Sequence, residues 1–303
     1  MRVVCLSGGV GGAKLARGLH DVLAPGELTV IGNVGDDLEV LGLHVSPDLD
    51  SILYALTSLN DEERGWGRGD ETWRTLESAK AWGGEGWFLL GDLDLGLHLV
   101  RTQALRDGET LSAVTARLTE RAGLATRLVP ATDDPLRTQV VTPDGPFSFQ
   151  EWFVGRQHRD EVDQVFYEGA YAARPAAGVL DAIRRAELLV FAPSNPYVSI
   201  GPILAVDAIR AAIAAQGVRC VAVSPLIGGR AVKGPLDRML TRMSGGTTPA
   251  HVADCYKGLI DALVIDRADA PGEAPVPLVV TDTLMVDRDV ARRLAETVLE
   301  ATR

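Results

Sequence analysis

The sequence predicts an α/β protein with a doubly wound, mostly parallel, Rossmann-like sheet and an inserted α+β cap region. The chain opens with an apolar strand at 2–6, an amphipathic helix at 13–23 and a second apolar strand at 28–31. The same alternation of strand and helix returns from residue 188. Strands that alternate with helices pair in parallel, and the helices cover both faces of the sheet.

The elements of the C-terminal half follow in a regular order. Short apolar runs predict strands, and the amphipathic runs between them predict helices. The predicted strands are 188–192, 220–223, 263–265 and 278–280, and the predicted helices are 203–215, 249–260 and one that begins at Asp287.

The middle of the chain, 60–175, is richer in tryptophan, glycine and charge than the rest. It predicts helices at 72–82 and 110–122 and a hairpin whose strands, 138–141 and 147–153, flank Pro143-Asp144-Gly145. We expect one α/β domain over 1–303, with 60–175 as an insertion that caps the sheet.

The composition excludes several classes of protein. The 303 residues are 46% hydrophobic, which is enough for a sizeable core, and the net charge of −11 gives nucleic-acid binding no electrostatic support. The three cysteines form no CxxC pair, so neither a disulfide scaffold nor a zinc site is expected. We see no signal peptide and no apolar run of roughly 18 residues. A cytoplasmic protein without membrane contact is therefore expected.

Polar, turn-forming residues follow the predicted strands. In open α/β sheets, ligands bind beyond the carboxyl ends of the strands, so these segments are expected to form the site. They read SGG from Ser7, GNVGDD from Gly32, PSNP from Pro193, SPLIGG from Ser224 and TDT from Thr281.

The segment SGGVGGAK, 7–14, resembles two phosphate-binding loops and matches neither. A dinucleotide fingerprint starting at Gly9 has Lys14 where the third glycine belongs. A Walker loop fails because Ala13 precedes the lysine and Leu15 replaces the hydroxyl residue that would hold Mg²⁺. Glycines before a helix still suit a phosphate or diphosphate, because they allow close approach to the amides of the first turn. The alternative is a tight turn without ligand, with Lys14 either a charge clamp or a solvated residue.

Grouped carboxylates follow the second strand. Asp36 and Asp37 come directly after it, and Asp48 and Asp50 lie in SPDLDS. Carboxylates at strand ends can hold Mg²⁺, which prefers oxygen ligands and phosphate partners. The alternative is capping of a helix that begins near Leu49, by Ser46 or Asp48, with Asp48 the better candidate.

Two further segments carry polar side chains. APSNPYVSIGPIL presents Ser194, Asn195 and Ser199 where a nucleotide would lie, or else makes an ordinary polar turn. In GDLDLGLHLVR, the spacing places Asp94, His98 and Arg101 on one helical face. We expect this face to lie at the surface and to form salt bridges.

Together, these segments resemble the 2-phospho-L-lactate transferase family, which builds the deazaflavin coenzyme F-420. The matching pieces stand in the family's order: LSGGVGGAKLARGL, IGNVGDDLEVLGLHVSPDLDSILYAL, RGWGRGDETW, WFLLGDLDLGLH and LLVFAPSNPYVSIGPIL. The related gluconeogenesis-factor regulators share the glycine loop but usually carry a DDGGSSG-type run after the second strand, which is absent here. A nicotinamide dehydrogenase is disfavoured by the broken fingerprint.

The resemblance implies a Mg²⁺-dependent transferase that works as a homodimer. The donor is a guanosine diphospho-linked three-carbon acid, the acceptor is the ribitol hydroxyl of the deazaflavin Fo, and GMP leaves. Archaeal members use phospholactate and actinobacterial members use phosphoenolpyruvate. The Ala/Gly/Arg-rich composition is typical of a high-GC bacterium, so we expect phosphoenolpyruvate as the donor acid. The product is then dehydro coenzyme F-420-0.

The resemblance also implies roles for individual residues. Asp50 contacts the deazaflavin and accepts the ribitol proton or orients the hydroxyl, and Asp36, with Asp37 as alternate, holds Mg²⁺. The other expected acceptor contacts are Trp87 and Asp92, within the cap, with Trp66 as the alternative to Trp87 for stacking on a flat ring. Archaeal members often carry basic residues where this chain has Leu89 and Leu93, so acceptor contacts at these two positions are not carried over. The expected donor contacts are Gly8, Gly9, Gly11, Gly12, Lys14, Ser194, Asn195 and Ser199.

Overall fold

A parallel sheet of seven strands forms the centre of the molecule in the computed structural model, which describes residues 1–301. The strand order is β14-β13-β10-β9-β1-β2-β5, and every neighbouring pair is parallel. The predicted doubly wound α/β fold is confirmed. The strands are β1 (Val3–Ser7), β2 (Leu28–Gly32), β5 (Arg127–Pro130), β9 (Leu188–Phe191), β10 (Cys220–Val223), β13 (Ala262–Asp266) and β14 (Leu278–Thr281).

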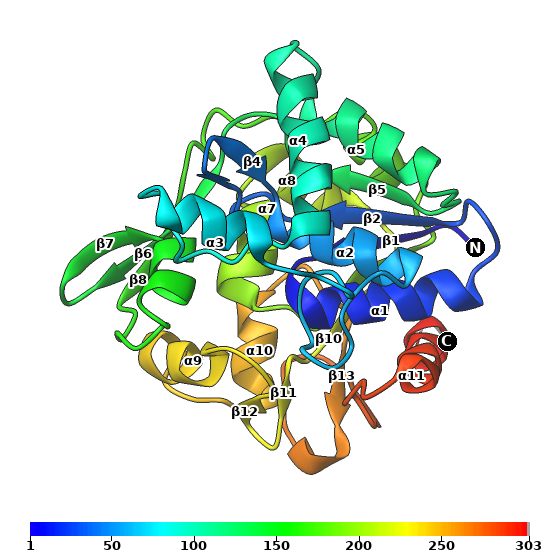
Figure 1. Ribbon diagram of the computed structural model, residues 1–303. Coiled ribbons are helices and arrows are strands. Elements are labelled where there is room, and N and C mark those ends of the chain that lie inside the picture. The colour runs from blue at the N-terminus through cyan, green and yellow to red at the C-terminus, as the bar shows by residue number, and fades with distance from the viewer. Residues whose placement is uncertain (302–303) are drawn as a thin grey trace.

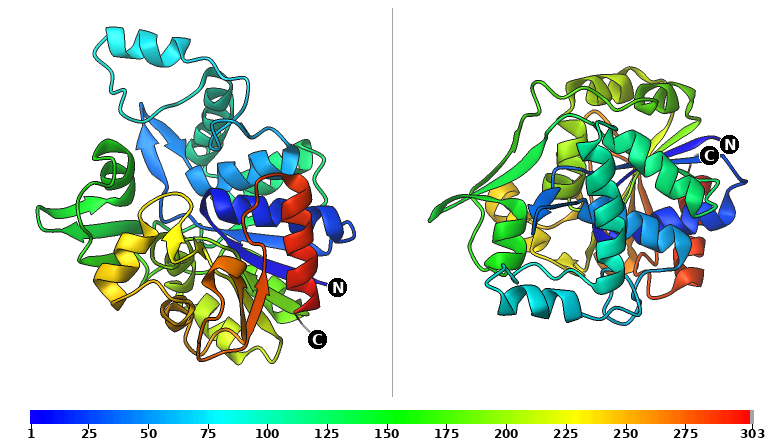
Figure 2. Two further views of the ribbon diagram at one scale, coloured as in Figure 1. Left: turned by 90° about the horizontal axis from the view of Figure 1, so that it is seen from below. Right: turned by 45° about the horizontal axis from the view of Figure 1, so that its top comes forward.

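Helices cover both faces of this sheet, as Figures 1 and 2 show. Val3 and Cys5 of β1 point into one hydrophobic cluster, and Val4 and Leu6 point into the other, because successive side chains of a strand alternate. The first cluster is covered by α1 (Gly9–Val22), α2 (Pro47–Thr57), α5 (Leu111–Arg121) and α11 (Arg288–Glu300). The second is covered by α6 (Val179–Arg185), α7 (Gly201–Leu204), α8 (Asp207–Ala215), α9 (Leu236–Ser244) and α10 (Pro249–Cys255).

The remaining elements make up the cap. They include a three-stranded antiparallel sheet of order β7-β6-β8, which projects away from the central sheet at the left of Figure 1. The predicted hairpin is confirmed, although its second strand ends at Ser148 and a π-helical turn, Glu151–Gly155, follows. The cap elements are β3 (Leu38–Val40), β4 (Leu43–Val45), α3 (Arg74–Ala81), α4 (Asp92–Arg106), β6 (Arg137–Thr142), β7 (Gly145–Ser148) and β8 (Gln164–Glu168). A short hairpin of β11 (Leu226–Ile227) and β12 (Arg230–Ala231) and a 3₁₀ turn, Arg267–Asp269, lie near β13.

Three local features differ from the sequence prediction. The helix expected at 13–23 begins at Gly9, so most of the glycine-rich segment is its first turn. The helix expected at 203–215 is two helices, α7 and α8, with a bend of 85° in this part of the chain. Neither glycine nor proline stands at the break, Ala205-Val206, so the sequence carries no local signal for it. Finally, β5 belongs to the central sheet and interrupts the insertion expected at 60–175.

Within residues 1–301, no single helix is both long enough and apolar enough to cross a membrane. One bent pair, Pro196–Leu204 with Asp207–Ala215, meets the requirement by length and composition when its two parts are taken together. Ile203, Ile209 and Ile213 of this pair are buried in the core. All three cysteines are free thiols.

Candidate functional site

The carboxyl ends of β9, β1 and β2 lie side by side, because these three strands are neighbours in the sheet. Polar contacts join the segments that follow them. The Ser194 hydroxyl accepts from the Gly8 N–H at 3.3 Å and donates to the Gly8 carbonyl at 2.7 Å. The Asn33 amide donates to the Val198 carbonyl at 3.2 Å. The expected convergence of these strand ends is therefore present.

The glycines of the first turn of α1 allow it to pack closely against the segment after β9. A Cβ at Gly11 would lie 2.6 Å from the Pro193 carbonyl oxygen. A Cβ at Gly12 would lie 2.5 Å from both the Ser194 and the Ser7 hydroxyl oxygens. At these two positions close packing explains the absence of a side chain. A phosphate contact there stays a prediction.

The N-terminus of α1 already holds an anionic side chain. Asp48 accepts from the Gly9 N–H at 2.7 Å and from the Asn33 amide at 2.9 Å. The first N–H groups of a helix have no partner within the helix, so those of Val10 and Gly11 remain for a ligand. The alternative that Asp48 caps α2 was wrong: its carboxylate caps α1 instead. The helix α2 begins at Pro47, and Ser46 stands at its N-cap position without a side-chain cap hydrogen bond.

Four buried carboxylates gather beside this helix end. Asp36, Asp37, Asp48 and Asp50 are each about 5% exposed or less. Burial, followed by the charge of Asp48, raises the pKa of Asp36 well above its ordinary value. Burial raises the pKa of Asp48 to about 6, against the opposing effect of its hydrogen bonds from Asn33 and Gly9. A cation at this position would offset the repulsion between these acids.

Two of these acids have a carboxylate oxygen that is free to contact a cation. Oδ1 of Asp36 and Oδ1 of Asp37 are buried and have no hydrogen-bond partner within residues 1–301. The other oxygen of Asp37 accepts from the Ser46 hydroxyl at 2.9 Å and contacts His44 Nε2 at 3.1 Å. The described residues contain no cluster of three or more His, Cys, Asp or Glu side chains that could hold a metal. Mg²⁺ needs only one or two carboxylates when phosphates and waters complete its shell.

Asp50 is paired with a buried arginine. Both of its carboxylate oxygens contact the Arg101 guanidinium, Oδ2 at 3.0 Å from Nη1 and Oδ1 against Nη2. Arg101 lies on α4 of the cap and is 1% exposed. Asp50 therefore links the first turn of α2 to the cap.

The polar face of α4 is buried, so the surface salt-bridge face expected there was wrong. His98 is 1% exposed and lies between two charged groups. Its Nδ1 is 3.4 Å from Arg101 Nη1 and its Nε2 is 3.2 Å from Asp94 Oδ2. The Tyr54 hydroxyl of α2 donates to Asp94.

Two of the residues after β9 that were expected to bind a nucleotide, Asn195 and Ser199, make contacts within the protein. Asn195 Oδ1 accepts from the Tyr197 N–H at 2.9 Å and from the Val198 N–H at 3.4 Å, which fixes the π-helical turn Pro196–Ile200. Ser199 is 6% exposed and packs over Gly8, where an added Cβ would lie 2.9 Å from its own Cβ. The structure places both at the edge of the site, and their contact with a nucleotide stays a prediction.

Trp87 and Asp92 lie on the cap. The Trp87 indole donates to Glu85 at 3.0 Å and meets the Phe88 ring edge-on, with centroids 5.7 Å apart. Asp92 accepts from the N–H groups of Arg74 and Thr75, at 3.1 and 2.9 Å, and so holds the first turn of α3. Hydrogen bonds, of which that from the Thr72 hydroxyl has the largest effect, lower the pKa of Asp92 to about 2. Both acceptor contacts stay predictions.

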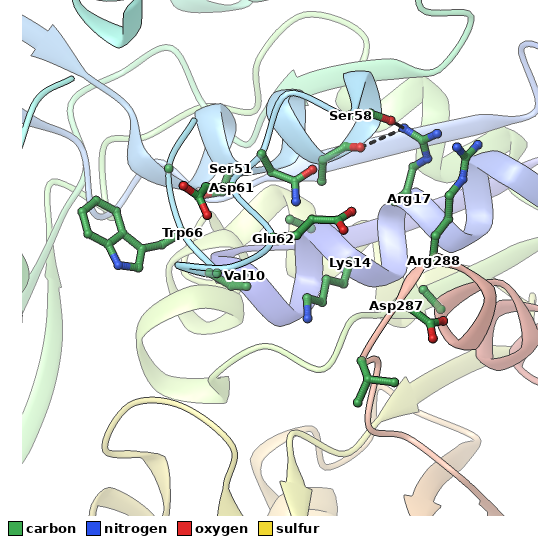
Figure 3. Close-up of a pocket in the computed structure, with 17 residues that line it drawn as sticks. Val10, Lys14, Arg17, Ser51, Ser58, Asp61, Glu62, Trp66, Asp287 and Arg288 are labelled. Carbon is green, nitrogen blue, oxygen red and sulfur yellow. Dashed lines mark hydrogen bonds between the residues drawn. The ribbon is translucent and has the colours of Figure 1, made fainter. Parts of the chain in front are cut away.

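Lys14 lies one helical turn after Gly11 on α1, and its side chain reaches the segment before α11. It lines a cavity of about 90 Å³ between α1, α2, α11 and the 60–67 loop, drawn in Figure 3. Its amine donates to the Met285 carbonyl at 2.7 Å. Burial, with the charge of Lys233, lowers the pKa of Lys14. A contact of Lys14 with a donor phosphate stays a prediction.

The roles of Asn33 and Arg101 were not predicted from the sequence. Asn33 stands in the quoted strand end GNVGDD, and its position directly after a buried strand was the available signal. Arg101 was placed on a helical face by its spacing, but spacing does not tell which partner buries that face.

Comparisons with known proteins cover nearly the whole chain. The family model of "2-phospho-L-lactate transferase CofD" matches residues 3–301. Proteins named phosphoenolpyruvate transferase are 44% identical, from Streptomyces griseus over 99% of this chain and 98% of that protein, and from Streptomyces coelicolor over 99% and 100%. A crystal structure of a UPF0052 family member from Bacillus halodurans has a TM-score of 0.66 at 18% identity, covering 98% of each chain. That last likeness concerns the fold alone. The family model and the relatives show that this chain belongs to the 2-phospho-L-lactate transferase family.

Proposed function

We propose that this protein transfers a phosphoenolpyruvyl group from a guanosine diphospho-linked donor to the ribitol hydroxyl of the deazaflavin Fo. GMP leaves, and the product is dehydro coenzyme F-420-0. The observation that carries the choice of donor is 44% identity, over nearly full length, to proteins named phosphoenolpyruvate transferase. The second candidate donor carries 2-phospho-L-lactate, which the description of the family favours.

The reaction balances as a single displacement at phosphorus. The ribitol oxygen forms a bond to the phosphorus that bears the three-carbon acid. The bond from that phosphorus to the bridging oxygen breaks, and GMP leaves with that oxygen. The hydroxyl proton passes to a base or to water. Such transfers depend mostly on positioning and on charge stabilisation.

The N-terminus of α1 supports a donor-phosphate site. Its free Val10 and Gly11 N–H groups and the positive end of its helix dipole favour an anion. The close packing of Gly11 and Gly12 against Pro193 and Ser194 fixes this helix end beside the segment after β9. Ser194, Asn195 and Ser199 then border the nucleotide.

Asp36 and Asp37 would hold Mg²⁺ through their unpartnered oxygens. When bound, the ion neutralises charge on the donor phosphates and on the leaving GMP. Asp48 keeps the end of α1 in place, and Asp50 faces the acceptor as an orienting carboxylate or proton acceptor. We also propose a homodimer, from family resemblance, and sedimentation equilibrium that returns the monomer mass would refute it.

The test of the function is release of GMP. The purified protein is incubated with Mg²⁺, Fo and the guanosine diphospho-linked phosphoenolpyruvate donor, with a matched sample that lacks Fo. We expect GMP only when Fo is present. Tight binding of a UDP-sugar with no turnover of the donor would instead favour a regulator of the gluconeogenesis-factor type.

A further inference from the structure

Arg101 is a buried cation whose guanidinium is directed at one carboxylate. Its two terminal nitrogens contact the two oxygens of Asp50, which is the forked geometry that fixes a carboxylate plane. An ionised carboxylate offers about four acceptor positions, so the fork leaves two for another donor. Asp50 is thus fixed in orientation while part of its accepting capacity remains.

The groups around Arg101 hold it in turn. A guanidinium has only donors, so the 3.4 Å contact from Nη1 requires His98 Nδ1 to accept. The ring proton then resides on Nε2, which lies 3.2 Å from Asp94 Oδ2 but outside hydrogen-bond geometry. Asp94 also accepts from the Tyr54 hydroxyl, one helical turn beyond Asp50 on α2. The chain of contacts starts and ends on α2 and passes through α4 of the cap.

Stability alone is a poor reason for this arrangement. The free energy needed to remove two charges from water offsets much of the attraction between them. Well-packed apolar residues can often replace such a pair without loss of folding stability. The pair also stands beside Asp48, whose raised pKa reflects burial and the charges of Asp37 and Asp50. The contacts of Arg101 with both Asp50 oxygens instead fix the orientation of the Asp50 carboxylate.

We propose that Arg101 is a positioning residue, which holds the Asp50 carboxylate in one orientation toward the acceptor hydroxyl. This inference rests on the proposed function, because it assigns Asp50 to the acceptor. Arg101 touches neither substrate in this arrangement and acts through Asp50. The buried His98 keeps the guanidinium in register with that carboxylate.

The test is a double-mutant cycle of Arg101→Lys and Asp50→Asn, in which kcat and both KM values are measured. Lysine keeps the charge and loses the fork. We expect Asp50→Asn to lower kcat roughly 100-fold. We expect Arg101→Lys to lower kcat roughly 10-fold to 100-fold, with the donor KM unchanged. In the Asp50→Asn background, Arg101→Lys should cause no further loss.

The cycle separates positioning from a merely structural role. Equal losses from Arg101→Lys in both backgrounds, or kcat within about twofold of wild type, would overturn the inference. Arg106→Lys, on the same helix and bonded to the Gly42 carbonyl at 2.8 Å, is the matched control and should keep full turnover. Absence of Fo-dependent turnover in the wild type would instead refute the proposed function.

A second pair of variants serves if Arg101→Lys does not fold. His98→Asn retains an acceptor near the Nδ1 position, and His98→Gln removes it while it keeps a donor near Nε2. We expect His98→Asn to retain most of the turnover and His98→Gln to lose it, again only when Asp50 is present. Equal turnover of the two variants would contradict the inference.

Discussion

Asp48 shows how one side chain joins local structure to the chemistry of the site. It stands in the first turn of α2, where a carboxylate is favoured by the helix dipole, and it also caps α1 through the Gly9 N–H. The same carboxylate bonds to the Asn33 amide. A single buried acid of α2 therefore joins the first turn of α1 to the strand end at Asn33.

The contribution of Asp94 to the free energy of unfolding depends on pH. Burial alone would raise its pKa, but the adjacent His98 ring, the hydrogen bond from the Tyr54 hydroxyl and the charge of Arg101 lower it below 3.8. A lowered pKa in the folded state stabilises the protein at pH values above 3.8, and this contribution is lost as the pH falls through the folded value.

Replacement of Asp94 by asparagine should therefore destabilise the protein in a pH-dependent way. We expect the free energy of unfolding to fall by about 1–3 kcal/mol at neutral pH, and the difference from wild type to shrink near about pH 3. Urea unfolding at both pH values measures it, with Glu120→Gln, an exposed position on α5, as control. A difference that is the same at both pH values would contradict the assignment.

At the scale of elements, α1 is held by close packing at its first turn and by its apolar face. Leu15 and Leu19 are fully buried, and each contributes about 1.5–3 kcal/mol by burial. Gly11 lies against the backbone of Pro193, so the helix approaches the segment after β9 more closely than any side chain would allow. This approach places the Val10 and Gly11 N–H groups at the proposed donor site.

Two glycine-to-alanine variants separate packing from helix propensity. Gly11→Ala forces a Cβ to 2.6 Å from the Pro193 carbonyl oxygen, so we expect a loss of about 1–3 kcal/mol and weaker donor binding. Gly96→Ala, inside α4, meets nothing within 4 Å and should stabilise the protein by about 0.5–1 kcal/mol. Thermal unfolding and donor titration measure both effects. A Gly11→Ala variant as stable as wild type would refute the packing explanation.

At the scale of the whole molecule, periodicity was enough to predict every strand of the central sheet except β5. The apolar runs at β1, β2, β9, β10, β13 and β14 are strands, and their polar carboxyl ends meet as expected. What periodicity missed depends on tertiary partners. The bend between α7 and α8 has no local signal, and β5 joins the sheet from within the predicted insertion. Asp36 and Asp50 were found as grouped acids that follow the second strand, whereas the pairing of Asp50 with Arg101 depends on the position of α4 in the cap.

The most direct test of the proposed transferase is the mass of its product. Fo, Mg²⁺ and equal amounts of the two guanosine diphospho-linked donors, phosphoenolpyruvyl and phospholactyl, are incubated with the protein and analysed by mass spectrometry. The expected product is Fo carrying the phosphoenolpyruvyl group, two hydrogens lighter than the phospholactyl product. A spectrum with only the heavier product would contradict the choice of donor, and unmodified Fo would contradict the transferase itself.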